Sequence, residues 1–166
     1  MDFFTVEVWT AKTLTHFHVL IVIDLSKRRV EIARISDRPQ GAWVQHVLRR
    51  QFDEFDGLLR NHKYLIHDRD PLFTKSMIEM LAWAGGKSVK LPPESPKLNA
   101  KIERFFRTLK RWLRLSCLIP TEARNQERLN EFQIWYNQYR EHGEHPAHTP
   151  NEQLAGIERN PDPFTQ

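Results

Sequence analysis

The strongest constraint on the fold is a change in the spacing of apolar residues along the chain. Over the first third, apolar and β-branched residues alternate or run continuously, which predicts strands over residues 2–9, 17–23 and 30–35. The links between these segments are too short for a crossover, so the three strands are expected to be antiparallel neighbours.

After residue 41 the apolar residues recur every three or four positions, which is typical of amphipathic helices. The helical stripes predicted in this way cover 43–59, 73–84, 98–117 and 121–140, and two short strands are predicted at 64–66 and 88–91. The order βββαβαβαα predicts an α/β domain with a mixed five-stranded sheet, whose first three strands are antiparallel, and with helices on both faces.

Length and composition leave room for one core and exclude several classes of protein. The chain has 166 residues, of which 40% are hydrophobic, and a single cysteine, Cys117. One cysteine excludes an intrachain disulfide and favours a reducing, intracellular setting. The longest apolar run is far shorter than the ~20 residues that cross a bilayer, so we expect a cytoplasmic protein without a membrane partner. Residues 1–155 are assigned to the domain and 156–166 to a C-terminal tail.

Three acidic residues occupy positions that could bring them together at one end of the sheet. Asp2 opens the first strand, Asp68 follows the fourth, and Glu103 lies in the first turns of the long helix. Carboxylate oxygens suit Mg²⁺ or Mn²⁺, and two such ions can promote an in-line attack on a phosphodiester. Taken singly, each residue is more often a surface charge, a helix cap or an ion-pair partner.

The sequence around these acids resembles the integrase core domain of bacterial transposases and retroviral-type integrases. The most specific part is Asn-x-x-x-Glu-Arg-Phe at 99–105, followed by Arg-Thr-Leu-Lys at 107–110. Other similar segments are 2–6, 23–30, 64–70 and 91–100. The resemblance covers about residues 2–155.

This resemblance implies a ribonuclease H-like fold in which Asp2, Asp68 and Glu103 are the catalytic and metal-binding residues. It implies Mg²⁺ or Mn²⁺ as cofactor, as a two-ion site when DNA is bound. The implied reaction is attack on DNA phosphodiesters, first by water and then by the freed 3′ hydroxyl, in transposition or DNA integration. The implied partners are element ends, target DNA and further protomers in a homodimer or higher oligomer. The implied location is the bacterial cytoplasm, with the protein at the nucleoid while it acts on DNA.

Two positions depart from the family pattern. Asp70 stands where many relatives have glycine, but Asp68 directly follows the strand, and Pro71 favours a helix-capping role for Asp70. Only Met1 precedes Asp2, whereas relatives place several strand residues before this aspartate, so we expect a late-starting first strand that holds Asp2 poorly. Two alternatives therefore stay open: an impaired remnant that binds DNA or a partner subunit, and a stand-alone metal-dependent nuclease.

The basic excess is concentrated in one predicted helix. The chain carries a net charge of +4, yet residues 97–114 contain seven basic residues and one acid, Glu103. The spacings within this helix place Glu103 and several cations on one stripe, where the cations could contact DNA phosphates. The alternative is a solvated face in which Arg107 pairs with Glu103. The residues expected to contact DNA are Asn99, Lys101, Arg104, Arg107, Lys110, Arg111 and Arg114, with helix capping as the alternative role of Asn99.

Histidines supply the remaining candidates. His142, His145 and His148 recur every three residues, but the intervening glycine and proline argue against a common helical face. Structural or solvated histidines are therefore preferred to a metal site there. His67, beside Asp68, either contacts substrate or fills the end of the strand.

Overall fold

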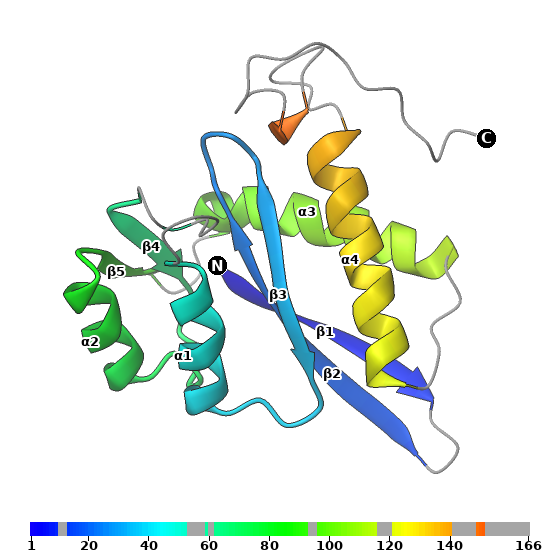
Figure 1. Cartoon of the computed structure of the whole chain (residues 1–166), viewed down its shortest axis with the longest axis horizontal. Coiled ribbons are helices and arrows are strands. Elements are labelled where there is room, and N and C mark those ends of the chain that lie inside the picture. Colours follow the sequence, from blue (N-terminus) through cyan, green and yellow to red (C-terminus); the bar gives the residue numbers. More distant parts are fainter. Residues whose placement is uncertain are drawn as a thin grey trace.

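The structure is a computed structural model that describes residues 1–9, 13–52, 59, 62–92, 96–115, 121–140 and 149–151, without the side chains of 9, 96–99, 114 and 115. Within these ranges the chain forms an α/β fold (Figure 1). Its strands are β1 (Asp2–Trp9), β2 (Leu14–Ile23), β3 (Val30–Ser36), β4 (Tyr64–His67) and β5 (Lys87–Lys90). Its helices are α1 (Gly41–Arg50), α2 (Lys75–Trp83), α3 (Pro96–Leu115) and α4 (Glu122–Gln138).

The strands form two sheets that meet at the start of β1. β1, β2 and β3 are antiparallel, as expected, and β4 pairs with β5 in parallel. The Met1 amino group donates a hydrogen bond to the Ile66 carbonyl oxygen at 2.8 Å, which links the start of β1 to β4. The α/β fold class is confirmed, but the expected five-stranded sheet is divided into three and two strands. Among the described residues, the start of β1 reaches β4 through the hydrogen bond from Met1 to Ile66, and β1 pairs along its length with β2.

Helices cover both faces of the antiparallel sheet, as the sequence predicts. Because successive side chains of a strand point to opposite faces, Phe4, Val6 and Val8 face α3 and α4, whereas Phe3 packs on the side of α1 and α2. The residues of α3 and α4 that complete the first core are Phe105, Leu109, Leu113, Leu129, Phe132 and Tyr136. The second core includes Val44, Val47, Leu48, Leu65, Met77 and Leu81.

The first predicted helix ends earlier than its apolar stripe suggests. α1 stops at Arg50, and the amide of Gln51 donates to the Leu48 carbonyl in a tightened last turn. Leu59 is nevertheless buried in the core beneath α1 and α2, and its amide donates to the Gln51 carbonyl at 2.8 Å. The apolar spacing up to Leu59 therefore indicates which residues are buried, but it does not indicate that α1 continues to Leu59.

Helix α4 protects the outer edge of β3. The amide of Val30 donates to Asn137 Oδ1 at 2.9 Å, and Asn137 Nδ2 donates to the Val30 carbonyl at 2.8 Å. Further along β3, the amide of Ile32 donates to Gln133 Oε1 at 2.6 Å, and the amide of Ile35 donates to Gln126 Oε1 at 2.9 Å. Side-chain amides of α4 therefore satisfy backbone groups that an edge strand would otherwise present to water.

Several sequence predictions fall outside the described residues, namely Cys117, His142, His145, His148 and the tail 156–166. None of the helices in the described ranges has the length and apolar content that crossing a membrane requires.

Candidate active site

The start of β1 and the end of β4 bring Asp2 and Asp68 to one end of the fold. The Met1 amino group, hydrogen bonded to Ile66, lies close enough to both carboxylates for each to stabilise its positive charge. Burial lowers the pKa of this amino group from 8.0 to about 6, and the charges of Asp2 and Asp68 oppose that shift. Two of the three predicted site residues therefore act on the same buried amino group and partly offset the cost of burying its charge.

Glu103 approaches the same region on α3 but does not complete a cluster. The Phe106 ring packs against Phe4 with 5.3 Å between centroids, so α3 lies over the face of β1 to which Asp2 also points. Glu103 is one helical turn before Phe106, and its side chain is exposed. Among the described residues, no group of three or more His, Cys, Asp or Glu side chains is arranged to hold a metal ion. The position of the Glu103 carboxylate in an assembled site stays a prediction.

The donor set suits a hard divalent cation at the aspartate pair. Asp2 and Asp68 supply carboxylate oxygens, which Mg²⁺ and Mn²⁺ prefer, and they already stabilise the positive charge of Met1. The residues that could hold a metal are thus Asp2 and Asp68, with Glu103 as the third candidate.

Two consecutive turns fix the loop after β4. Asp68 Oδ1 accepts a hydrogen bond from the Asp70 amide at 3.1 Å, and Asp70 Oδ1 accepts one from the Leu72 amide at 2.8 Å. The cap of α2 is Thr74, whose side chain accepts from the Met77 amide. The predicted helix-capping role of Asp70 is therefore wrong, because α2 begins at Lys75 and Asp70 lies in the preceding turn. Asp70 shapes the loop that orients Asp68.

His67 fills the end of β4. Its side chain is fully buried, with Nδ1 2.7 Å from the Asp68 carbonyl oxygen and Nε2 2.7 Å from Ser88 Oγ. The ring also packs edge-on against Phe73 at 4.7 Å. Burial lowers the pKa of His67, and its hydrogen bond to the Asp68 carbonyl opposes this. Of its two predicted roles, the structure favours the structural one, because the ring has no surface for a substrate.

The cations predicted to contact DNA lie on α3. Those with described side chains are all exposed: Lys101, Arg104, Arg107, Lys110 and Arg111. Lys101 Nζ donates to the Leu25 carbonyl at 3.3 Å, and Lys110 Nζ lies 5.9 Å from the centroid of the Phe4 ring. No ion pair joins Glu103 to Arg107 in the described part of the chain, which disfavours the paired alternative.

Asn99 and Arg114 also lie on α3, but their side chains are outside the described part of the chain. Because α3 begins at Pro96, Asn99 is the fourth residue of the helix and does not occupy the capping position considered from the sequence.

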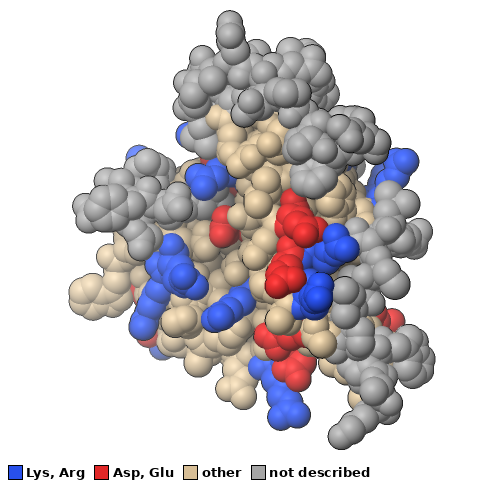
Figure 2. All heavy atoms as spheres, turned by 45° about the vertical axis from the view of Figure 1, so that its right-hand side comes forward, with Lys and Arg blue, Asp and Glu red and all other residues tan. Residues whose placement is uncertain are grey.

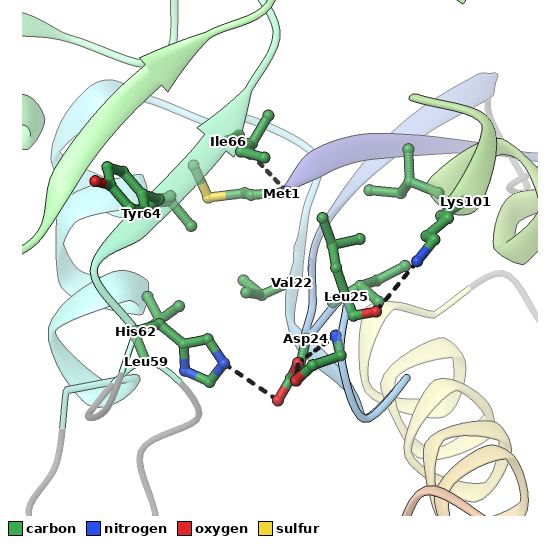
Figure 3. A pocket seen from close by; sticks show the side chains of 13 residues that line it. Met1, Val22, Asp24, Leu25, Leu59, His62, Tyr64, Ile66 and Lys101 are labelled. Carbon is green, nitrogen blue, oxygen red and sulfur yellow. Dashed lines mark hydrogen bonds and ion pairs between the residues drawn. The ribbon is translucent and has the colours of Figure 1, made fainter. Parts of the chain in front are cut away.

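The sequence did not indicate Asp24 and His62, which line a cavity of about 280 Å³ beside Met1 (Figure 3). Asp24 Oδ1 accepts hydrogen bonds from the Ser26 amide, the Ser26 hydroxyl and the Lys27 amide, and Asp24 Oδ2 lies 3.1 Å from His62 Nε2. Burial raises the pKa of Asp24, but these hydrogen bonds and His62 outweigh it, so the pKa is lowered. An aspartate with a serine two residues later, after an apolar strand, is a turn pattern that could have been noticed. The contact with His62 depends on the tertiary fold.

Comparison with known proteins shows a family whose model matches part of the chain and solved structures that share its fold. The integrase core domain family matches residues 87–150, a segment that includes β5, α3 with Glu103, and α4. The resemblance to the integrase core domain is therefore confirmed. The search of curated proteins finds no match.

Solved integrase structures share the fold of the chain. The catalytic core of bovine immunodeficiency virus (BIV) integrase matches with a TM-score of 0.60 and 20% identity, covering 93% of each chain. The catalytic core of human T-cell lymphotropic virus 2 (HTLV-2) integrase, in complex with magnesium, matches with a TM-score of 0.64 and 14% identity, over 92% of this chain and 93% of that one. These matches support the ribonuclease H-like fold, and their low identity shows the fold alone.

A longer relative is found in the simian T-cell lymphotropic virus intasome. It matches with a TM-score of 0.71 and 15% identity over 99% of this chain. The present chain spans only 57% of that protein.

Proposed function

We propose that this chain is the catalytic core of a DNA transposase or integrase, which cleaves and joins DNA strands with a divalent metal. The observation that supports the proposal is that Asp2 and Asp68 both lie near the Met1 amino group, which bonds to β4, beside the helix that bears Glu103. Glu103 also lies inside the segment that matches the integrase core family.

Each residue has a distinct role in the proposed reaction. Asp2, at the start of β1, and Asp68, directly after β4, would hold the metal, and Glu103 would join them from α3. Bound Mg²⁺ or Mn²⁺ would supply activation of the attacking oxygen and stabilisation of the leaving oxygen. The cations of α3 position the DNA backbone through phosphate contacts, without reading its sequence.

The proposed partners are element ends, target DNA and a second copy of the chain, with action at the nucleoid of a bacterial cell. The comparisons support the oligomer in part: the HTLV-2 core is described in dimeric and trimeric forms, and the simian viral protein belongs to an intasome. Magnesium accompanies the HTLV-2 core in both forms.

A second candidate is a catalytically impaired relative that binds DNA or a partner subunit. The observation favouring it is that the described carboxylates do not assemble into a group of three. A stand-alone nuclease of the same fold would cleave DNA but not join it.

A strand-transfer assay separates these functions. The protein is incubated with Mg²⁺ or Mn²⁺, supercoiled DNA and candidate element ends, and nicked and joined products are resolved on gels. A Glu103→Gln variant serves as the test and Glu122→Gln, an exposed acid of α4, as the matched control. We expect nicking and joining by the wild type and by Glu122→Gln only.

Each other outcome assigns a different function. Activity that survives Glu103→Gln would contradict the proposed triad. Nicking without joining would assign a nuclease, and DNA binding without either product would assign the impaired relative.

A further inference from the structure

An aromatic contact joins the chain neighbours of the two candidate aspartates. Phe3 directly follows Asp2 in β1, and His67 directly precedes Asp68 at the end of β4. The ring of Phe73 contacts both neighbours. It stacks on Phe3 with 5.0 Å between centroids and 17° between planes, and it lies edge-on to His67 with 4.7 Å between centroids. A single buried phenylalanine therefore connects the start of β1 with the end of β4.

Ser88 of β5 extends this contact on the far side of His67. Ser88 Oγ lies 2.7 Å from His67 Nε2, and His67 Nδ1 lies 2.7 Å from the Asp68 carbonyl oxygen. A carbonyl oxygen only accepts hydrogen bonds, so Nδ1 carries the proton of the neutral ring and the Ser88 hydroxyl donates to Nε2. The two bonds fix the orientation of the buried ring and connect the backbone of Asp68 to β5. We refer to the side chains of Phe3, Phe73, His67 and Ser88 as the column.

The loop that carries Asp68 begins and ends at members of the column. It leaves β4 at His67 and returns at Phe73, whose amide donates to the Asp70 carbonyl at 3.0 Å. The Asp70 amide in turn donates to Asp68 Oδ1 at 3.1 Å. The Asp68 carboxylate is therefore held by a turn whose two ends are fixed in the column.

The column matters because the two aspartates lie on different sheets. In the described ranges, β1 pairs with β2 and β4 pairs with β5, so no shared ladder sets the distance between Asp2 and Asp68. Ligands of a metal site must be held within about 0.5 Å of their working positions. Close-packed side chains transmit small displacements, so the column can supply this precision where a ladder does not.

We propose that the column positions Asp2 and Asp68 relative to each other, and that Phe73, His67 and Ser88 are positioning residues of the candidate metal site. This inference rests on the proposed function for its relevance to catalysis. The column touches the aspartates through their chain neighbours and the Asp68 carbonyl, and it needs no contact with metal or DNA.

Two substitutions interrupt the column at different points. Ser88→Ala removes the hydroxyl that bonds to His67, and Phe73→Leu removes the ring between His67 and Phe3. Ser88→Thr keeps the hydroxyl and is the conservative variant. The controls are Val89→Ala, the exposed neighbour in β5, and Phe52→Leu, a half-buried ring of the same core.

The first measurement is amide hydrogen exchange without metal or DNA. The reporters are the amides of Asp70 and Phe3, which donate to Oδ1 of Asp68 and to Oδ1 of Asp2. We expect both amides to exchange about tenfold faster in Phe73→Leu than in Phe52→Leu, because local opening no longer breaks the same packing. Ser88→Ala should accelerate Asp70 alone, and Ser88→Thr should restore it. Nitrogen NMR of the His67 ring should show the proton on Nδ1.

The second measurement is the Mg²⁺ or Mn²⁺ concentration that gives half of the metal-induced rise in Tm. This concentration should increase about tenfold in Ser88→Ala and Phe73→Leu, because loss of the groups that orient metal ligands costs 10–100-fold in affinity. Ser88→Thr should stay near the wild-type value. Val89→Ala and Phe52→Leu should lower the starting Tm without changing the metal concentration, as expected for residues that only stabilise the fold.

The outcomes separate this inference from the proposed function. Exchange rates and metal concentrations equal to those of the controls would overturn the inference and make the column ordinary core packing, as would a proton on His67 Nε2 in place of Nδ1. If the wild type shows no metal-induced rise while the exchange differences are present, the proposed function fails and the positioning of the aspartates is supported.

Discussion

Helices α3 and α4 pack on the same sheet face but use their polar residues in opposite ways. α4 turns Gln126, Gln133 and Asn137 inward, where their amides bond to the backbone of β3. α3 packs its aromatic and aliphatic stripe on the sheet and leaves its cations exposed. Polar residues that stabilise the fold and polar residues available to a partner are thus separated on neighbouring helices.

Charge patterning follows the same division. α4 intersperses acids with bases, and Arg128 pairs with Glu131 at 2.9 Å. On the face shown in Figure 2, acidic and basic side chains lie side by side. α3 has Glu103 as its single acid among seven basic residues of 97–114. Mixed charges on α4 largely offset one another, whereas an excess of cations on α3 is suited to a polyanion.

The largest expected effect is on catalysis and comes from α3. Glu103→Gln should lower the rate of strand cleavage by at least about a hundredfold, since even indirect partners of metal ligands cost 10–100-fold. Its Tm should stay close to the wild-type value, because the side chain is exposed and carries no ion pair among the described residues. A large loss of Tm would instead show that Glu103 stabilises the fold, as the amides of α4 do, and would contradict the proposed difference between the two helices.

The next largest effect is on stability and comes from α4. Asn137→Ala leaves the buried N–H and C=O of Val30 without their partner and should cost about 2–4 kcal/mol. Urea denaturation measures this cost, and Gln138→Ala, an exposed neighbour, should change stability by less than about 0.5 kcal/mol. Equal effects of the two changes would show that the contact with β3 is not stabilising.

Metal binding should distinguish the candidate metal site from the structural contact of α4 with β3, with an effect of intermediate magnitude. Mg²⁺ at about 100 times its Kd should stabilise the wild type by about 2.7 kcal/mol, seen as a rise in Tm. Asn137→Ala should retain this rise from its lower starting Tm, whereas the combined Asp2→Asn and Asp68→Asn changes should abolish it. A rise that persists without both aspartates would place the metal elsewhere.

The smallest effect concerns DNA binding and its salt dependence. Neutralising Arg107 and Lys110 to Gln should reduce the slope of log K against log salt by roughly one for each phosphate that the protein no longer neutralises. Arg124→Gln with Arg128→Gln on α4 is the matched pair and should leave the slope unchanged. If the α3 double variant and the α4 double variant had the same slope, the cations of α3 would be solvent-exposed charges that do not contact DNA phosphates.

The spacing of apolar residues predicted the strands and helices well where the buried residues of an element are also its apolar residues. The bounds of β1 match the alternating segment 2–9, whereas β2 begins at Leu14, before the predicted 17–23. Its first residues pair with β1 but are less buried, so an apolar run could not reveal them. The apolar stripe that ends at Leu59 had the opposite effect: it predicted a helix longer than α1, because a residue outside a helix can be buried in the same core.

The candidate site was predictable only in part. The ends of β1 and β4 follow from the order of the strands, and Asp2 and Asp68 both lie near the Met1 amino group, but their role as a metal site stays a prediction. The approach of Glu103 depends on the side-chain arrangement of α3, and the contact of Asp24 with His62 depends on long-range packing. The amides of α4 were also missed, because only their register against β3 gives them a role.

The contact of α4 with β3 also bears on how copies of this protein can associate. An edge strand with unpaired backbone groups invites edge-to-edge growth and aggregation, and side-chain amides along its length block that route. Edge-to-edge growth through β3 is therefore blocked, and a neighbouring molecule on this side would meet side chains of α4, whose shape limits how many copies can fit.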